Sequence, residues 1–270
     1  MKKSKLAKVL TVSLAALMVF GLASCGGGSG KVSDKDITVI SREEGSGTRD
    51  AFTELTGVLQ DDVDKTVDTA EISNSTSVVT QSVAGNDAAI GYISLGSLDD
   101  TVKAVKVDGV EATVDNIKSG DYKIQRPFNI VTKGEVKELP ADFIKFIMSK
   151  DGQKIIEDEG YISVNDDAEA YKASGLKGSI TLAGSTSVSP VMEVLADKYK
   201  ELNSGVTIEI QQTGSGAGIQ STTEGVCDIG MASRELKDEE TSQGLKSEEI
   251  ALDGIAVIVN KDNGVEDLSM

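Results

Sequence analysis

The sequence predicts an α/β protein with mostly parallel sheets, because short apolar, β-branched runs alternate with helix-compatible segments along the chain. Three units repeat the order of strand, Gly/Ser-rich loop and helix, at residues 37–55, 180–199 and 206–224. Residues 250–260, IALDGIAVIVN, form a near-continuous apolar run that is typical of a buried central strand. With 270 residues, 39% of them hydrophobic, the chain is long enough for one large or two smaller domains.

The first of these units, residues 37–55, has the arrangement that binds anions. Its apolar run ends at a Gly/Ser turn, and the residues that follow favour a helix. Glycines let the backbone approach a ligand, and the unpaired N–H groups and the dipole of a helix N-terminus favour negative charge. Ser46, Gly47 and Thr48 supply hydroxyl and backbone donors there, and Arg42 supplies a guanidinium group suited to a tetrahedral oxyanion.

A Gly/Ser turn beside a surface arginine is the simpler interpretation of this segment on its own. Repetition favours the anion site, because residues 180–199 and 206–224 place two further Gly/Ser loops before helices. In the second unit Ser189 is the expected N-cap and Pro190 the first helical residue. We therefore expect one anion site assembled from several loops.

The segments between these units complete the alternation. Residues 61–68 are acidic and indicate a solvated loop, and residues 165–177 are a polar linker. The other expected elements are a helix at 74–84 capped by Ser75 or Ser77, strands at 88–94 and 102–107, a strand at 122–131 that crosses between lobes, and a helical pair at 140–149 and 152–159. The aromatic residues of the helical pair are expected in the core rather than at a ligand.

The N-terminus has the order of a secretion signal. Four lysines among the first eight residues precede an apolar run at 9–20 that is too short to span a bilayer. Residues 22–25, LASC, resemble a bacterial lipobox, in which the signal is cut before the cysteine and the cysteine is lipidated. We expect residues 1–24 to be a lipoprotein signal peptide and residues 25–36 to be lipidated Cys25 with a flexible glycine tether. The mature protein would then be lipid-anchored at the extracytoplasmic face of the cell membrane.

The formal net charge is −17, and it becomes −21 once the four lysines of the signal are removed. Such a charge argues against binding to nucleic acid or to an anionic membrane surface, because both need basic patches. Anion binding remains compatible with it where buried N–H groups, hydroxyls and one or two arginines act at close range.

The residue inventory argues against catalysis and against a resident cofactor. The chain has no histidine, so neither a Ser-His-Asp nor a Cys-His arrangement can form. No metal-ligand spacing is present either. Of the two cysteines, Cys25 is the expected lipidation site and Cys227 lies in an apolar run as a small buried hydrophobic residue, so no disulfide is expected. We expect a binding protein, neither an enzyme nor a metalloprotein.

Five ordered motifs resemble those of the phosphate-binding lipoprotein, the substrate-binding protein of the bacterial phosphate ABC transporter. They are SRxxGSGTR at 41–49, IGY at 90–92, GSTSVxP at 184–190, TGSG at 213–216 and DIGxxSR at 228–234. The resemblance covers essentially everything after the tether. It implies a two-lobed periplasmic-binding-protein fold of type II, monomeric, whose hinged lobes close on inorganic phosphate and deliver it to the permease subunits. It also implies phosphate contacts from three loops, at Thr186 and Ser187, at Ser215, and at Arg42, Ser46, Gly47 and Thr48.

Two departures from the family concern the organisation of the chain. The motif order is permuted, since the family ordinarily begins with the GSTS unit and reaches the SRxxGSGTR unit in the middle. One lobe would then be residues 37–123 and the other residues 124–270. The family also runs on past the point that corresponds to Met270, so we expect the 37–123 lobe to be incomplete.

A third departure concerns selectivity. Phosphate at neutral pH carries a proton and sulfate does not, so a carboxylate acceptor favours phosphate. Many phosphate binders place an aspartate just after the serine that corresponds to Ser233, but Arg234 stands there, where it could serve the anion or pair with Glu235. Asp253, inside an apolar strand, is the predicted acceptor, and a salt-bridged structural carboxylate is an equally good interpretation of it.

Two alternative functions remain open at this point. The same fold could bind another oxyanion, such as sulfate or molybdate, which competition binding would separate from phosphate. It could also serve as a cell-surface phosphate sensor or adhesin that is not coupled to transport.

Overall fold

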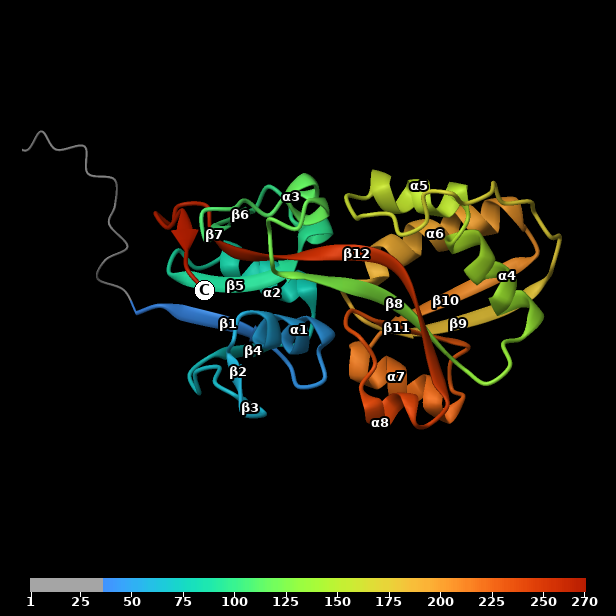
Figure 1. The fold of residues 1–270 in the computed structure, drawn as a ribbon, viewed down its shortest axis with the longest axis horizontal. Coiled ribbons are helices and arrows are strands. Elements are labelled where there is room, and N and C mark those ends of the chain that lie inside the picture. Colours follow the sequence, from blue (N-terminus) through green and yellow to red (C-terminus); the bar gives the residue numbers. More distant parts are fainter. Residues whose placement is uncertain (1–35) are drawn as a thin grey trace, which may run out of the picture. The chain divides into compact units, whose positions relative to one another are not determined.

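The computed structural model describes residues 36–270 (Figure 1). The predicted signal peptide and the lipidation site Cys25 lie outside the described residues, as does nearly all of the tether. Among the described residues, no helix is both long enough and apolar enough to cross a membrane.

Within residues 36–270, nine strands form the main sheet, in the order β10-β9-β11-β8-β12-β5-β1-β4 with β6 paired to β12. In that order their bounds are Val206–Gln212, Gly178–Gly184, Ile229–Ala232, Gln125–Lys133, Leu245–Asn260, Ala89–Ser94, Thr38–Arg42, Glu71–Ser73 and, for β6, Val102–Ala104. We call the part built around β1, β4 and β5 the first lobe, and the part built around β9, β10 and β11 the second lobe.

The two long strands β8 and β12 connect the lobes (Figure 1). The first part of β12 pairs antiparallel with β8, from Leu245 opposite Lys133 to Gly254 opposite Gln125. Its last part pairs antiparallel with β5, from Ile255 opposite Ser94 to Val259 opposite Ile90. The predicted buried strand at 250–260 and the predicted crossing strand at 122–131 are therefore confirmed.

The prediction of mostly parallel sheets holds inside each lobe and fails between the lobes. β9, β10 and β11 are parallel to one another, and so are β1, β4 and β5. β8 and β12 run antiparallel to each other and to their neighbours β11 and β5. The physical reason is that β8 carries the chain from the first lobe into the second and β12 carries it back.

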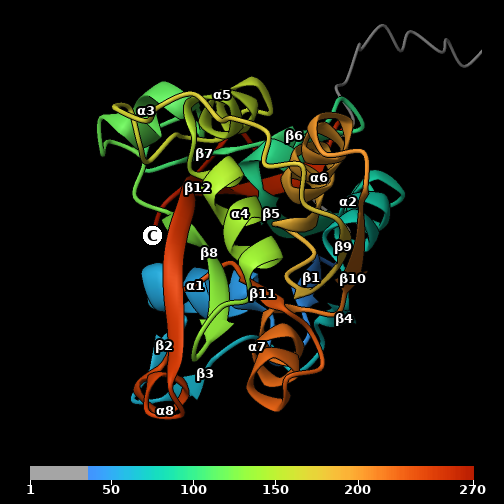
Figure 2. The ribbon, with the colours of Figure 1, turned by 90° about the vertical axis from the view of Figure 1, so that its right-hand side faces the viewer.

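Helices cover both faces of the sheet in the second lobe. α4 (Glu138–Ile147), α5 (Lys150–Asp158) and α6 (Ser189–Leu202) lie on one side and α7 (Ser215–Glu224) lies on the other, as both views show (Figures 1 and 2). Phe143 and Phe146 of α4 are fully buried in this core beside Tyr199, which confirms that they are core residues. The Ser189 prediction is off by one residue: α6 begins at Ser189, whose hydroxyl donates back to the Ser185 carbonyl at 2.9 Å instead of capping the helix.

The first lobe is packed from both sides of β12. Ala256 and Ile258 face α2 (Thr76–Ala84), while Ile255, Val257 and Val259 face the cluster that includes Ala51 of α1 (Gly47–Leu55). This alternation follows from the period of two in a strand. The division of the chain into lobes at residue 124 stays a prediction. Residues 255–259 pack in the core of the first lobe, although they follow residue 124 in the sequence.

The smaller elements confirm most of the remaining predictions. Ser75 caps α2, as predicted. The acidic segment at 61–68 is not wholly a loop, because Asp61 and Asp62 adopt positive φ and form the turn of a hairpin. The elements not yet named are β2 (Leu59–Gln60), β3 (Val63–Asp64), the 3₁₀ turn η1 (Leu95–Ser97), β7 (Lys106–Val107), α3 (Val114–Lys118), α8 (Asp238–Thr241) and β13 (Asp267–Leu268).

The contact of α7 with β9 gives a test of the fold. A Cβ atom at Gly218 would lie inside van der Waals contact of the Gly184 Cα and the Ala183 carbonyl oxygen, both of them backbone atoms. Since backbone yields less than a side chain, we expect Gly218→Ala to lower the free energy of unfolding by about 1–3 kcal/mol. Urea denaturation measures this, with Gly264→Ala as the control because nothing lies within 4 Å of a Cβ there. Equal stability of the two variants would contradict the packing.

Candidate functional site

Four helix N-termini meet where the two lobes touch: those of α1 and α2 from the first lobe, and those of α6 and α7 from the second. The Thr48 and Thr76 hydroxyls each lie 3.0 Å from the Ser187 hydroxyl across the interface. Thr76 also reaches Thr186, with its hydroxyl and its backbone N–H both 3.3 Å from the Thr186 hydroxyl. Helix N-termini carry unpaired N–H groups and a partial positive charge, so this arrangement favours an anion.

The loop before α1 is shaped for this contact. Ser46 caps the helix by accepting the Arg49 N–H, and Gly45 adopts a φ of 80°. The Gly45 carbonyl then accepts the N–H of Gly216, at the start of α7, at 2.9 Å. A Cβ at Gly47 would lie only 2.6 Å from the Ser215 hydroxyl. A larger residue there would keep the two lobes apart.

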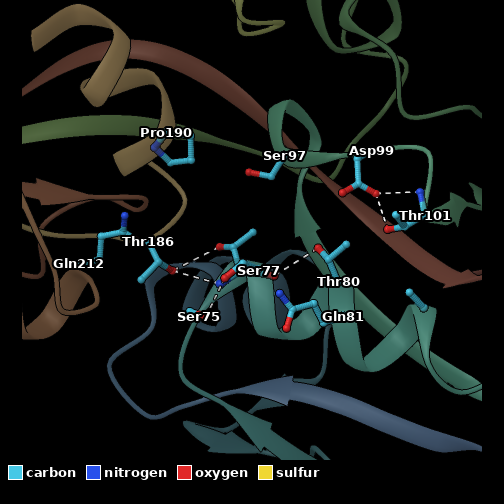
Figure 3. Close-up of a pocket in the computed structure, with 12 residues that line it drawn as sticks. Ser75, Ser77, Thr80, Gln81, Ser97, Asp99, Thr101, Thr186, Pro190 and Gln212 are labelled. Atoms are coloured by element: carbon cyan, nitrogen blue, oxygen red, sulfur yellow. Dashed lines mark hydrogen bonds between the residues drawn. The ribbon is translucent and has the colours of Figure 1, made fainter. Parts of the chain in front are cut away.

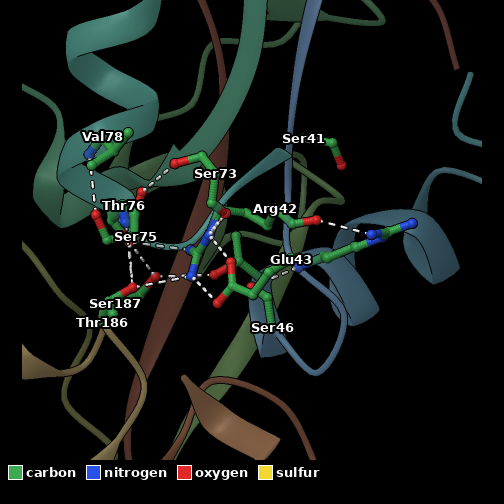
Figure 4. A network of polar contacts seen from close by, with 12 residues as sticks. Ser41, Arg42, Glu43, Ser46, Ser73, Ser75, Thr76, Val78, Thr186 and Ser187 are labelled. Atoms are coloured by element: carbon green, nitrogen blue, oxygen red, sulfur yellow. Dashed lines mark hydrogen bonds and ion pairs between the residues drawn. The ribbon is translucent and has the colours of Figure 1, made fainter. Parts of the chain in front are cut away.

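The Arg42 side chain lies in the middle of the hydroxyl groups (Figure 4). It is 2% exposed. Its Nη1 donates to the Thr76 hydroxyl at 3.4 Å, and its Nη2 donates to the Thr186 hydroxyl at 3.2 Å. Its Nε and Nη2 also donate to the Glu43 carboxylate, at 2.8 and 2.9 Å. A guanidinium group at this point can bind two oxygens of one tetrahedral anion.

The strand that carries Arg42 is held from the side of β5. The Tyr92 hydroxyl lies 2.8 Å from the Ser41 hydroxyl and accepts the Arg42 N–H at 3.3 Å. The Tyr92 ring stacks on Phe52 of α1, with the ring centroids 4.0 Å apart. Burial raises the pKa of Tyr92, so its hydroxyl keeps its proton and continues to act in these hydrogen bonds.

A second group of hydroxyls, those of Ser185, Ser215 and Ser233, lies next to the first. Ser233 accepts the Ser185 hydroxyl at 2.9 Å and lies 3.3 Å from the Ser215 hydroxyl, whose oxygen also accepts the Ser233 N–H at 3.1 Å. The predicted residues Arg42, Thr48, Thr186 and Ser187 thus share one network. Ser215 and Ser233 lie next to this network, because their hydroxyls are the nearest side-chain atoms to a Cβ position at Gly47, the neighbour of Thr48.

A cavity of about 690 Å³ opens beside the network (Figure 3). Thr76 and Thr186 belong both to its lining and to the network. Hydroxyl and amide side chains dominate the rest of the lining: Ser75, Ser77, Thr80, Gln81, Ser97, Thr101 and Gln212. The cavity therefore connects the buried hydroxyl groups to the surface.

Arg234 does not point into the network. Its Nη1 and Nη2 each lie 2.8 Å from an oxygen of Glu240, and its Nε lies 3.0 Å from Asp50. The predicted pairing with Glu235 is limited to the backbone, since Nη1 donates to the Glu235 carbonyl. Burial works against the charged form, but the hydrogen bonds and charge of Glu240 raise the pKa of Arg234. These contacts favour a structural role.

Asp253 is held in a buried ion pair with Arg126 of β8. Its Oδ2 accepts hydrogen bonds from the Nε and the Nη2 of Arg126, both at 3.2 Å. Its Oδ1 accepts a hydrogen bond from the Ser94 hydroxyl at 2.9 Å. Burial raises the pKa of Asp253 to about 6, although Arg126 acts in the opposite direction. Both oxygens are engaged, so the contacts favour the salt-bridged interpretation of Asp253 over that of an acceptor for the anion.

Sequence reasoning does not assign Thr76 or Arg126 to this region. It places Thr76 only in a helix, although the N-terminus of a helix is itself a signal for an anion contact. It places Arg126 only in a crossing strand. An arginine inside an apolar run must find a buried partner, and Arg126 donates to the Ser233 carbonyl at 3.2 Å as well as to Asp253.

Comparison with known proteins identifies the family. A family model described as a PBP superfamily domain matches residues 28–151 and 169–270. Phosphate-binding protein PstS 2 of Streptococcus agalactiae is 52% identical over 276 residues, which cover 100% of this chain and 93% of the relative. The chain belongs to the PstS family. PstS 2 of Streptococcus pneumoniae is 49% identical over 98% of this chain and 94% of its own length.

A solved structure agrees with this assignment. The phosphate-binding protein of a phosphate ABC transporter from Streptococcus pneumoniae has a TM-score of 0.68 and 51% identity, covering 86% of this chain and 92% of that one. The predicted family and the two-lobed periplasmic-binding-protein fold are therefore confirmed. The streptococcal sequences align along nearly the whole chain, so they are collinear with it.

The Arg126–Asp253 pair gives a pH-dependent prediction. Arg126→Met leaves the Asp253 carboxylate buried and unpaired, which we expect to cost about 3–5 kcal/mol of unfolding free energy at pH 8. The raised pKa means that the folded state holds the Asp253 proton more tightly than the unfolded chain does. Arg126 lowers the pKa of Asp253, so the variant raises that pKa above about 6, and the cost should shrink between pH 8 and pH 5 as the buried carboxylate takes up a proton. Denaturant titrations at both pH values measure it.

The double variant Arg126→Met/Asp253→Asn is the control for that experiment. It removes both charges, so its own free energy of unfolding should lack the change between pH 8 and pH 5 that the titration of Asp253 causes. A cost for Arg126→Met that is equal at pH 5 and pH 8 would contradict the assignment of Asp253 as its partner.

Proposed function

We propose that the protein captures inorganic phosphate outside the cytoplasm and delivers it to an ABC permease. The observation that carries this proposal is the buried Arg42 guanidinium, which donates to the hydroxyls of Thr76 and Thr186 at helix N-termini of the two lobes. A tetrahedral dianion needs many donors at short range, and this arrangement supplies them from both lobes. The family membership supports the same function.

In this proposal the anion enters between the hydroxyl groups that now contact each other. The hydroxyls of Thr48 and Thr76 in one lobe and of Thr186 and Ser187 in the other exchange their mutual contacts for hydrogen bonds to phosphate oxygens. The lobes must separate to admit the anion, because these hydroxyls lie only 3.0–3.3 Å apart. Each hydroxyl can then rotate from accepting to donating. The cavity beside Thr76 and Thr186 is the proposed route from solvent.

Release and capture would use the two connecting strands. β8 and β12 are the strands of the main sheet that join the lobes, and such strands act as hinges in binding proteins that close around a ligand. Opening would separate Thr48 and Thr76 from Ser187 and expose the ligand. A lipid anchor at Cys25 and a monomeric state complete the proposal, since a tethered monomer can present its ligand to the permease. No chemical step is involved.

Calorimetric titration of phosphate at pH 7, with and without excess sulfate, tests the function. We expect binding that persists in sulfate. No heat from a folded sample would contradict phosphate capture, and loss of binding in sulfate would indicate a general oxyanion site.

Arg42→Ala tests the assignment of the site. A hydrogen bond to a charged group is worth about 1.5–3 kcal/mol, so the loss of this guanidinium group should weaken phosphate binding at least tenfold. Arg234→Ala is the matched comparison, since its guanidinium group lies on Glu240 and Asp50 and the affinity should change less than threefold. Unchanged affinity of Arg42→Ala would remove Arg42 from the site.

A further inference from the structure

The cavity beside the hydroxyl network is much larger than an inorganic phosphate ion. Its volume is about 690 Å³, within the range of about 300–1,000 Å³ that pockets for whole organic ligands have. A water molecule occupies about 30 Å³ in the liquid, and an ion of only five heavy atoms would fill a small part of the cavity. The remaining space is large enough for a substituent attached to the phosphate group.

This cavity begins at the anion contacts. Thr76 and Thr186 belong to its lining, and they accept hydrogen bonds from the Nη1 and the Nη2 of Arg42, at 3.4 and 3.2 Å. From Thr76 the lining follows one face of α2 as far as Ala84, and eight residues at 1.5 Å per residue make about 12 Å. A phosphate group bound to Arg42 therefore has space beside it for a chain of several carbon atoms.

Both lobes contribute to the walls of the cavity (Figure 3). Gln81 of α2 comes from the first lobe, and Gln212 at the end of β10 comes from the second. The lobes already touch, because the Thr76 and Ser187 hydroxyls lie 3.0 Å apart, and the cavity is open in this arrangement. A substituent in the cavity would therefore not prevent the lobes from closing over the phosphate group.

The lining limits the kind of substituent that fits. Serine, threonine and glutamine side chains dominate it, and they offer both donors and acceptors to the hydroxyl groups of a ligand. Of the described residues that line the cavity, Asp99 alone is charged, and none is aromatic. Hydrogen bonds from the Thr101 hydroxyl and N–H lower the pKa of Asp99, so its carboxylate stays ionised at pH 7.

These features argue against two common kinds of phosphate compound. A second phosphate group would meet the negative charge of Asp99 without a basic residue to bind it. A nucleobase would find no aromatic ring in the lining on which to stack. An uncharged chain that carries hydroxyl groups fits the lining best.

We propose that the site also binds phosphate monoesters of small, uncharged polyols. The phosphate group lies at Arg42, Thr76 and Thr186, and the bridging oxygen points into the cavity. The polyol hydroxyls exchange hydrogen bonds with the amides of Gln81 and Gln212. The ester is bound intact, and no bond is made or broken. This inference rests on the proposed function, because it uses the same anion contacts.

Calorimetric titration of glycerol 3-phosphate at pH 7 tests the inference. We expect a dissociation constant within tenfold of that for inorganic phosphate, and we expect the two ligands to compete for one site. A weaker affinity, or no heat, from protein that binds inorganic phosphate overturns the inference. Simultaneous binding of both ligands overturns it too, because the ester would then occupy a different site.

Gln81→Trp tests the position of the polyol. Gln81 is exposed on α2, so a larger side chain there fills part of the cavity without entering the core. We expect the affinity for glycerol 3-phosphate to fall at least tenfold and the affinity for inorganic phosphate to change less than threefold. Unchanged affinity for the ester in folded Gln81→Trp overturns the placement of the polyol in this cavity.

Val78→Trp is the matched control. It introduces the same side chain on the same helix, at a residue that is 41% exposed and does not line the cavity. Neither affinity should change by more than threefold. A loss of ester binding in Val78→Trp as large as that in Gln81→Trp would mean that the helix and not the cavity is responsible, and it would overturn the inference.

Pyrophosphate tests the class of substituent. We expect it to bind at least tenfold more weakly than glycerol 3-phosphate, because its second phosphate group would lie in a cavity whose one charged residue is Asp99. Binding of pyrophosphate within tenfold of the ester overturns the preference for uncharged substituents.

The inference and the proposed function fail in different ways. Protein that binds neither inorganic phosphate nor the ester overturns the proposed function. Protein that binds inorganic phosphate but not glycerol 3-phosphate overturns only the inference about esters.

Discussion

A buried guanidinium group must have compensating partners, and the position of Arg42 imposes this requirement on the whole region between the lobes. Removing a charge from water costs several kcal/mol unless hydrogen bonds and an opposite charge replace the lost hydration. Arg42 meets this requirement with hydroxyls from both lobes and with the Glu43 carboxylate. The loops before α1, α2 and α6 are held together by hydroxyl contacts in which this cation takes part.

Two buried arginines solve the same electrostatic problem in different ways. Arg126 is paired with Asp253, which is 1% exposed and also accepts a hydrogen bond from Ser94. This cation is therefore neutralised by a fully buried carboxylate that is fixed in position. Arg42 is paired with Glu43, whose side chain is 24% exposed. The first arrangement joins β8 to β12 where the lobes connect. In the Arg42–Glu43 pair the carboxylate is partly exposed, so it can move when a ligand binds.

The local arrangement also resolves the contradiction between a formal net charge of −17 and the binding of an anion. Exposed carboxylates are screened over about 10 Å at physiological salt, whereas N–H groups and a guanidinium group in direct contact act unscreened. Acidic residues near the site are further neutralised by ion pairs, as with Asp50 and Glu240 on Arg234. Net charge therefore describes the surface and not the site.

Local patterns in the sequence were enough to predict the α/β class, the buried strand at 250–260, the helix at 74–84 and the loops at Arg42, Thr186 and Ser215. Each of these depends on residues close together in the chain, where periodicity, glycines and caps act. Only the tertiary structure decided the antiparallel course of β8 and β12, the entry of Thr76 into the hydroxyl network, and the partners of Asp253 and Arg234. Asp253 and Arg126 are 127 residues apart, and Arg42 and Thr186 are 144 apart. No local pattern specifies such contacts, because they exist only once the two lobes have packed against their shared strands.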